Sequence, residues 1–139
     1  MDDKLYPHSD ITEKIISAAF EVYNRLGPGF LEAVYENAFI IALHKRGLKV
    51  VRQKIYRIVF DGQVVGEHRI DLLVENKVIV ELKAVNGLMP DVYKAQLISY
   101  LRLTNLLVGL LINFGNDEIE FRRIQNKFEL EKQAKAEIK

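Results

Sequence analysis

Two neighbouring stretches decide the fold of this chain: HRIDLLV at residues 68–74 and VIVELKAV at residues 78–85. Both are rich in β-branched and other apolar residues, which is typical of buried strands. Each nevertheless carries charge, with Asp71 in the first stretch and Glu81 and Lys83 in the second. Side chains alternate between the faces of a strand, so Glu81 and Lys83 project to the same side. Charged groups in an apolar strand are costly unless they are paired or coordinated, so these residues are candidates for a site.

The connection between the two strands tests this interpretation, because it sets their pairing register. A two-residue turn at Asn76-Lys77 would place Asp71 opposite Leu82, on the wrong face. A three-residue loop, Glu75-Asn76-Lys77, or a bulge would place Asp71 beside Glu81. The chemical interpretation therefore predicts an odd-numbered loop. The alternative is an ordinary surface ion pair between the glutamate and the lysine, and these strands alone leave both interpretations open.

Two carboxylates and a lysine suit phosphodiester hydrolysis. Asp71 and Glu81 would supply the hard oxygen ligands that Mg²⁺ prefers, and the metal would activate a bound water. Lys83 would orient that water or stabilise the charge that develops on the phosphate. The three residues therefore predict a metal-dependent reaction at a phosphate group.

Hydrophobic periodicity and turn residues predict the order helix, helix, three strands, helix and two strands. The helices are expected over residues 10–26, 30–46 and 92–103, and the strands over 49–60, 64–74, 78–85, 106–114 and 119–124. Asp10 and Glu13 form a capping-box pattern that predicts the start of the first helix. The second helix is expected to bury Leu31, Val34, Tyr35, Ala38 and Ala42.

This order indicates one mixed α/β domain. The domain is expected over residues 10–125, preceded by a flexible N-terminal arm at residues 1–9. Residues 126–139 are expected to form a charged C-terminal tail, either a short helix or a frayed end.

Composition excludes several classes of site. The chain has no cysteine, which excludes disulfides, thiolate zinc sites and cysteine nucleophiles. The longest apolar stretch, residues 106–112, is interrupted by Gly109 and falls short of the roughly 18 residues that a membrane span needs. The N-terminus lacks the apolar run of a signal peptide, so a cytoplasmic location without membrane association is expected.

Charge does not by itself indicate a nucleic-acid-binding protein, because the formal net charge is only +1. Basic residues do gather near the end of the second helix and in the first strand, namely Lys45, Arg46, Lys49, Arg52, Lys54 and Arg57, with a second pair at Arg122 and Arg123. They slightly favour contacts with phosphates, although exposed strand edges also carry such residues to discourage aggregation.

Asp71, followed after nine residues by Glu81-Leu82-Lys83, resembles the D…(D/E)xK signature of the PD-(D/E)XK nuclease superfamily. The element order over residues 30–114 is similar to the restriction-endonuclease-like core of that superfamily, a central mixed β-sheet flanked by helices. The stretch GFLEAVY at residues 29–35 resembles the G-x-x-E-x-x-Y motif that names a small bacterial and archaeal family within it. RID, ELKAV and QLISYL, which begin at residues 69, 81 and 96, are similar to later blocks of that family.

This resemblance implies a role for each matching residue. The implied metal ligands are Asp71, Glu81 and the backbone carbonyl of Leu82, and the implied catalytic group is Lys83, assisted by Glu32 and Gln96. Tyr35 and Tyr100 match motif positions without a clear role. Without the resemblance, Glu32 would be explained by the preference for a carboxylate in the first turn of a helix.

The sequence therefore predicts a nuclease-like protein that hydrolyses phosphodiester bonds in DNA with Mg²⁺, or with Mn²⁺ in its place. The alternative is a non-cutting nucleic-acid-binding or assembly module with the same fold, acting in repair, defence or a mobile element. RNA as the substrate, and a homodimer that presents two sites, are left open by the sequence.

Overall fold

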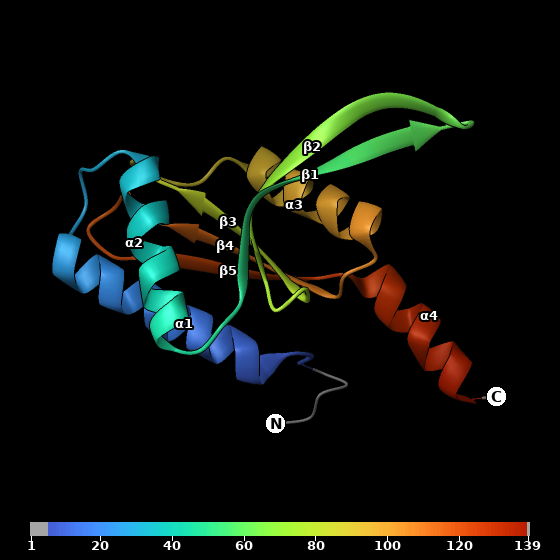
Figure 1. Ribbon diagram of the computed structural model, residues 1–139, viewed down its shortest axis with the longest axis horizontal. Helices are drawn as coiled ribbons and strands as arrows, with labels where there is room; N and C mark the ends of the chain where they lie inside the picture. Colours follow the sequence, from blue (N-terminus) through green and yellow to red (C-terminus); the bar gives the residue numbers. More distant parts are fainter. Residues whose placement is uncertain (1–5, 139) are drawn as a thin grey trace.

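The computed structural model describes residues 6–138 of the chain (Figure 1). Its elements are α1 (Ser9–Leu26), α2 (Glu32–Lys45), β1 (Val50–Phe60), β2 (Gln63–Val74), β3 (Val78–Lys83), α3 (Asp91–Thr104), β4 (Val108–Asn113), β5 (Glu120–Gln125) and α4 (Lys127–Ile138). The strands form one sheet in the order β1-β2-β3-β4-β5. β3 and β4 are parallel, and the other neighbours are antiparallel. The predicted mixed α/β architecture is confirmed.

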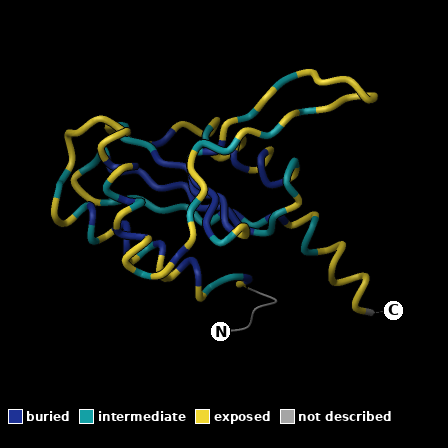
Figure 2. Tube along the Cα trace, in the orientation of Figure 1, coloured by how far each residue is buried: buried dark blue, intermediate teal, exposed yellow. Residues whose placement is uncertain are grey.

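The sheet lies between two helical layers, with α1 and α2 on one face and α3 on the other (Figure 1). Strand residues divide between the two cores accordingly: Val78, Val80 and Leu82 pack toward α1 and α2, whereas Ile79 packs toward α3. β4 is buried along its whole length, which is why its sequence is nearly continuously apolar. Figure 2 shows this buried centre in dark blue.

The predicted capping box at the start of α1 is wrong. The helix begins at Ser9, and His8 precedes it in a left-handed conformation without a side-chain capping bond. The His8 carbonyl accepts from the amides of Ile11 and Thr12, at 3.0 and 2.9 Å. Because the helix begins before the predicted cap, Asp10 lies in the first turn, where its carboxylate favours the helix dipole.

The predicted buried face of α2 is wrong at its N-terminal end. Leu31 is 80% exposed and Val34 is 39% exposed, because the helix begins only at Glu32 and its first turn lies at the rim of the domain. Burial begins at Tyr35 and continues through Phe39, Ala42 and Leu43, with Ala38 partly buried.

Tyr35 fixes the loop that joins α1 to α2. Its hydroxyl donates to the carbonyl of Gly27 at 2.6 Å and accepts from the amide of Phe30 at 3.2 Å. Its ring is fully buried and stacks on Phe114, with centroids 4.7 Å apart. Gly27 and Gly29 within this loop have positive φ, a conformation that glycine adopts without strain. The motif tyrosine is therefore a structural residue that closes the loop onto the core.

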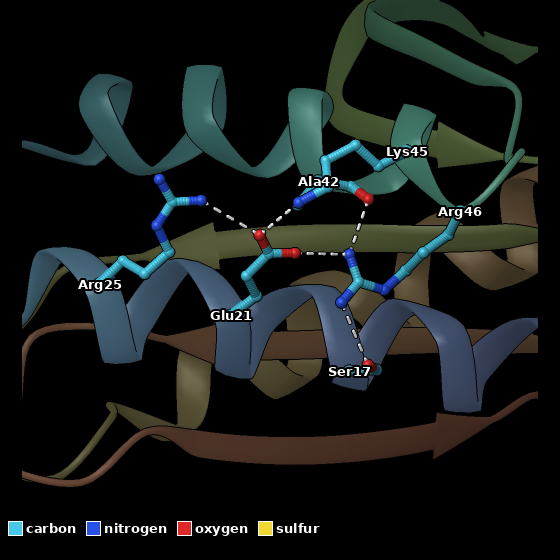
Figure 3. A network of polar contacts seen from close by, with 6 residues as sticks. All are labelled: Ser17, Glu21, Arg25, Ala42, Lys45 and Arg46. Atoms are coloured by element: carbon cyan, nitrogen blue, oxygen red, sulfur yellow. Dashed lines mark hydrogen bonds and ion pairs between the residues drawn. The ribbon is translucent and has the colours of Figure 1, made fainter.

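An ion-pair cluster joins α1 to the end of α2 (Figure 3). Glu21 accepts from Lys45 at 2.6 Å, from Arg46 at 2.8 Å and from Arg25 at 3.3 Å. Hydrogen bonds from Lys45 and Arg46 lower the pKa of the Glu21 carboxyl to about 2. Lys45 and Arg46, two residues of the predicted basic cluster, thus share one carboxylate within the protein, and the predicted contact of this cluster with phosphates stays a prediction.

β3 ends at Lys83, two residues before the predicted end. The following chain is instead paired to the segment after β4 through two asparagine side chains. Asn113 accepts from the amide of Val85 and donates to its carbonyl, at 2.9 and 3.0 Å. Asn116 does the same with Gly87, at 2.7 and 2.8 Å. These side chains substitute for strand pairing and hold the carboxyl ends of β3 and β4 together.

The predicted N-terminal arm and C-terminal tail are described by the structure to different extents. The predicted N-terminal arm lies largely in residues 1–5, outside the described residues, and Ser9 already belongs to α1. In the predicted tail, the chain forms the helix α4, which projects from the body of the domain (Figure 1). None of the helices in residues 6–138 combines the length and apolar character that a membrane crossing requires.

Candidate active site

The loop between β2 and β3 has the three residues that the chemical interpretation requires. Val74 pairs with Val78, and Leu72 pairs with Val80, so Glu75, Asn76 and Lys77 form the loop. Glu75 and Asn76 are both left-handed, with φ of 54° and 55°. One step further along the same register, Asp71 lies opposite Glu81. The predicted odd-numbered loop is confirmed, and it brings the two carboxylates together.

Hydrogen bonds hold the carboxylates of Asp71 and Glu81 against the backbone of the neighbouring strand. Asp71 Oδ2 accepts from the backbone amide of Leu82 at 2.9 Å. Glu81 Oε1 accepts a longer bond, 3.4 Å, from the backbone amide of Asp71. Each carboxylate thus accepts from the strand opposite, and the two side chains are held at one point between β2 and β3.

Glu81 lies in an unfavourable electrostatic environment. The residue is 7% exposed. Burial and, to a smaller extent, the Asp71 carboxylate beside it together raise the pKa of its carboxyl to about 9, while Lys83 acts in the opposite direction. Two acids at one buried point cannot both ionise without a compensating cation, and a divalent metal supplies that compensation.

Lys83 shares the α3-facing side of β3 with Glu81, as the alternation of the strand predicts. Its ammonium lies over the ring of Tyr93, 4.4 Å from the centroid. An ammonium within about 6 Å of an aromatic face is attracted by the ring quadrupole. Tyr93 in α3 thus holds the lysine at the carboxyl end of β3; no sequence motif had indicated this residue.

Glu32, at the first position of α2, reaches the site electrostatically from the other helical layer. Desolvation raises the pKa of its carboxyl, and the Asp71 carboxylate raises it further, whereas Lys83 lowers it. The residue itself is exposed. Glu32 is therefore an exposed residue near enough to Asp71 and Lys83 to interact with them electrostatically.

Two polar residues of α3, Tyr100 and Gln96, match motif positions but differ in burial. Tyr100 is buried. Burial raises the pKa of its hydroxyl, and the charges of Glu81 and Asp71 raise it further, so the hydroxyl lies close to the acidic pair. Its ring also packs against His68 of β2, with centroids 4.0 Å apart. Gln96, one turn before Tyr100, is exposed on α3.

Sequence reasoning missed a polar cluster of β1 and α2 at the level of Asp71. Gln53 of β1 lies at the level of Asp71 in the register and has a left-handed φ of 54°, which is uncommon for a non-glycine residue. The buried Glu36 accepts from Gln53 and from Arg52, each at 2.7 Å. Glu36 follows Glu32 by one helical turn, and this spacing is the only signal in the sequence that could have indicated it.

The donor set suits a hard divalent cation. In residues 6–138, no three acidic or histidine side chains come close enough together to form a metal cage by themselves. Two carboxylates with a neighbouring backbone carbonyl are nevertheless the oxygen-rich, incomplete set that Mg²⁺ accepts, because this ion retains several of its waters. The residues present therefore fit the metal that the sequence predicted.

A family model described as the PD-(D/E)XK nuclease superfamily matches residues 9–124. The chain belongs to this superfamily. Among solved structures, the one titled "Crystal structure of SSO0001" is similar to this chain with a TM-score of 0.55, at 19% identity, over 97% of this chain and 68% of the other. At this identity the likeness supports the fold alone. The comparison with curated proteins found no match.

The restriction-endonuclease-like fold predicted from the sequence is thereby confirmed. Membership of the superfamily gives the domain a nuclease-like function and implies binding of nucleic acid, and such nucleases typically use divalent metals.

Proposed function

We propose that this protein hydrolyses phosphodiester bonds in DNA at a site formed by Asp71, Glu81 and Lys83, with Mg²⁺ as its metal. The observation that carries this proposal is the apposition of Asp71 and Glu81 across a three-residue loop, with Lys83 on the face of Glu81. Two strands otherwise filled with apolar residues would not retain a buried Glu81 beside the half-buried Asp71 for packing alone.

Asp71, Glu81 and the carbonyl of Leu82 would hold the metal, and Glu32 would bind its waters at the mouth of the site. The metal would supply Lewis acidity and a water of lowered pKa. The ammonium of Lys83, fixed against Tyr93, would donate to the attacking water or to a non-bridging phosphate oxygen. Gln96, at the solvent side of α3, would contact the backbone of the bound strand.

The finer family assignment is part of the same proposal. The motif GFLEAVY at residues 29–35 supports membership of the G-x-x-E-x-x-Y family. In this structure its tyrosine closes the α1–α2 loop, and its glutamate interacts electrostatically with Asp71 and Lys83. The motif would thus combine one residue that shapes the loop with one that would face the bound metal.

Cleavage assays with purified protein test the proposal directly. Labelled single-stranded, duplex and branched DNA, and RNA, are incubated with Mg²⁺ or Mn²⁺ and the wild type, Asp71→Asn or Lys83→Ala. We expect the wild type to cut DNA and each variant to lose at least about a hundredfold in rate. Lys132→Ala, in the projecting helix α4, is the matched control and should cut like the wild type. Equal cutting by all proteins would reject the site.

A second function has one observation in its favour. Lys45, Arg46 and Arg52, three of the six basic residues of the predicted cluster, form ion pairs with Glu21 and Glu36, which reduces the charge that they offer to a phosphate backbone. A non-cutting nucleic-acid-binding or assembly module needs neither a metal nor a strongly basic surface. Calorimetric titration with Mg²⁺ separates the two functions: binding that Glu81→Gln abolishes supports the nuclease, whereas absence of both binding and cutting supports the module.

A further inference from the structure

A cavity of about 490 Å³ lies between α3, the end of β5 and the start of α4. α4 leaves the body of the domain beside the C-terminal end of α3 (Figure 1). Two apolar residues line the cavity, Ile98 and Phe128, which are 39% and 66% exposed. Three cationic residues line it as well, Lys94 and Arg102 of α3 and Lys127 of α4. We call this cavity the basic cavity.

The cations of the basic cavity have no acidic partner. Among residues 6–138, no aspartate or glutamate lines the cavity. Within the same residues, Lys94, Arg102 and Lys127 form no ion pair. Arg123 also lines the cavity, but its guanidinium donates to α1 and to the chain before it. Three uncompensated positive charges around one cavity repel one another, so an anionic ligand would stabilise them.

Asn126, between β5 and α4, fixes the walls of the basic cavity to each other. The residue is 6% exposed, and its side chain donates to the carbonyls of Leu101 and Leu106, both at 3.0 Å. Arg102 follows Leu101 and Lys127 follows Asn126, so these bonds hold the backbone at both cations. The basic cavity is therefore formed before any ligand arrives.

An aromatic ring beside several free cations is the combination that recognises nucleotides. A base stacks on the ring, and the cations bind the phosphates. Lys94 and Arg102 are eight residues apart on α3, or about 12 Å along the helix axis. Successive phosphates of one strand are about 3.4 Å apart along a duplex axis, so this length exceeds that of a single phosphate. The cavity thus suits a segment of polynucleotide.

We propose that the basic cavity binds an unpaired segment of the nucleic acid whose backbone reaches Asp71 and Glu81. The inference rests on the nucleic-acid binding of the proposed function. Phe128 would stack against a base, and the three cations would contact the neighbouring phosphates. The segment must be unpaired, because the faces of bases within a duplex are covered by the adjacent bases.

The basic cavity and the candidate active site lie on two sides of α3. Tyr93 holds Lys83 at the active site, and Lys94, the next residue, lines the cavity. A strand that joins the two would cross α3, which with its side chains is about 10–12 Å wide. The residues exposed on the outer side of α3 between them are uncharged: Ala95, Gln96 and Ser99. A path over these residues therefore carries no acid that would repel phosphates.

Two observations favour nucleic acid over an acidic protein segment as the ligand. Phe128 offers a stacking surface, which a base uses and a carboxylate does not. Membership of the superfamily implies binding of nucleic acid.

The first experiment measures binding of a labelled single-stranded oligonucleotide by fluorescence anisotropy, without divalent metal and over a range of salt concentrations. Arg102→Gln and Lys127→Gln should each weaken binding about fivefold. Each should also reduce the slope of log affinity against log salt by about 0.7, the value for one phosphate contact of a single strand. Lys14→Gln, at an exposed lysine of α1 in the opposite helical layer, is the matched control and should leave both quantities unchanged.

The second experiment tests stacking and the requirement for an unpaired segment. Phe128→Leu keeps an apolar side chain and removes the ring, so binding of the single strand should weaken at least about fivefold. Binding of a duplex of the same sequence should change by less than twofold, about the error of the measurement. Phe60→Leu, at the similarly exposed phenylalanine of the β1–β2 hairpin, is the matched control and should bind like the wild type.

Cavity variants that bind the single strand like the wild type would overturn the inference, and so would an equal loss for Phe60→Leu. If polyglutamate displaces the labelled strand as effectively as the unlabelled oligonucleotide, the cavity belongs to an acidic protein segment instead. None of these measurements needs cleavage. A protein that cuts DNA with unaffected cavity variants rejects the cavity alone, whereas one that cuts nothing but loses affinity in these variants rejects the nuclease alone.

Discussion

The inner and outer halves of β2 belong to one strand but differ in which residue is unexpected. The buried inner half contains a charged residue, and the exposed outer half contains large apolar residues. In the inner half, residues 70–74, the apolar residues are buried and Asp71 is the exception. In the outer half, residues 63–69, polar side chains are unremarkable, and the exceptions are the exposed Val64 and Val65. A polar group is informative where burial makes it costly, and an apolar group is informative where water surrounds it. The strand thus carries a candidate site at its buried end and an exposed ribbon at the other.

The largest expected difference between the halves is in stability. Leu72→Ala removes a fully buried side chain and should lower the free energy of unfolding by about 2–5 kcal/mol. Val64→Ala in the exposed half should change it by less than about 0.5 kcal/mol. Urea denaturation measures both values. Equal losses would mean that the outer half belongs to the monomer core.

Binding of Mg²⁺ should stabilise the protein through the inner half of β2 alone, where Asp71 lies. Mg²⁺ would neutralise the acidic pair and should stabilise the wild type by about 2.7 kcal/mol at one hundred times its dissociation constant. Thermal melting should show this increase for the wild type and for Glu131→Gln, a matched change in α4. Asp71→Asn and Glu81→Gln should lose it. A similar shift in all four proteins would place the bound ion elsewhere.

Removing the aromatic support of Lys83 should have a smaller effect. Tyr93→Leu eliminates the ring and should reduce cleavage by about fivefold, which corresponds to about 1 kcal/mol. Tyr93→Phe keeps the ring and should retain most of the activity. If the phenylalanine variant is as impaired as the leucine variant, the hydroxyl matters instead of the ring.

The smallest expected effect concerns the stability contribution of Glu21, whose pKa is lowered by its cationic partners, whereas the pKa of Glu81 is raised by burial. The pKa of Glu21 is lowered from 4.5 to about 2 by its cationic partners, so its contribution to stability is present above pH 4.5 and is lost as the pH falls toward 2. Glu21→Gln should therefore reduce the loss of stability between these pH values. Unfolding measured at pH 6 and pH 3 tests this, and an unchanged pH dependence would contradict it.

Much of the fold followed from local patterns in the sequence. The turn at Asp61-Gly62 and the alternation of Glu81, Leu82 and Lys83 are short-range features, because strand geometry and glycine conformation act within a few residues. The start of α1 and the burial of Leu31 and Val34 were predicted incorrectly. Helix ends depend on what the first turn packs against, and local propensity does not contain that information.

The acidic pair could be anticipated because it depends on a three-residue loop between adjacent strands. The supports around it could not. Tyr93, Gln53 and Glu36 lie in three different elements, and their contacts arise only when α2, α3 and β1 pack around the end of β3. The asparagine bridges from Asn113 and Asn116 are equally invisible in the sequence, since they join segments 28 or 29 residues apart.

The sequence by itself determined the mixed α/β architecture and the identity of the three charged residues, and it limited the register of β2 against β3 to two alternatives, between which the structure decided. These follow from side-chain periodicity and loop length, which are properties of neighbouring residues. Only the tertiary structure decided that Lys83 lies on Tyr93, that Lys45 and Arg46 share the carboxylate of Glu21, and that the outer part of the β1–β2 hairpin is exposed. Each depends on distances between segments far apart in the chain, which packing of the whole domain sets.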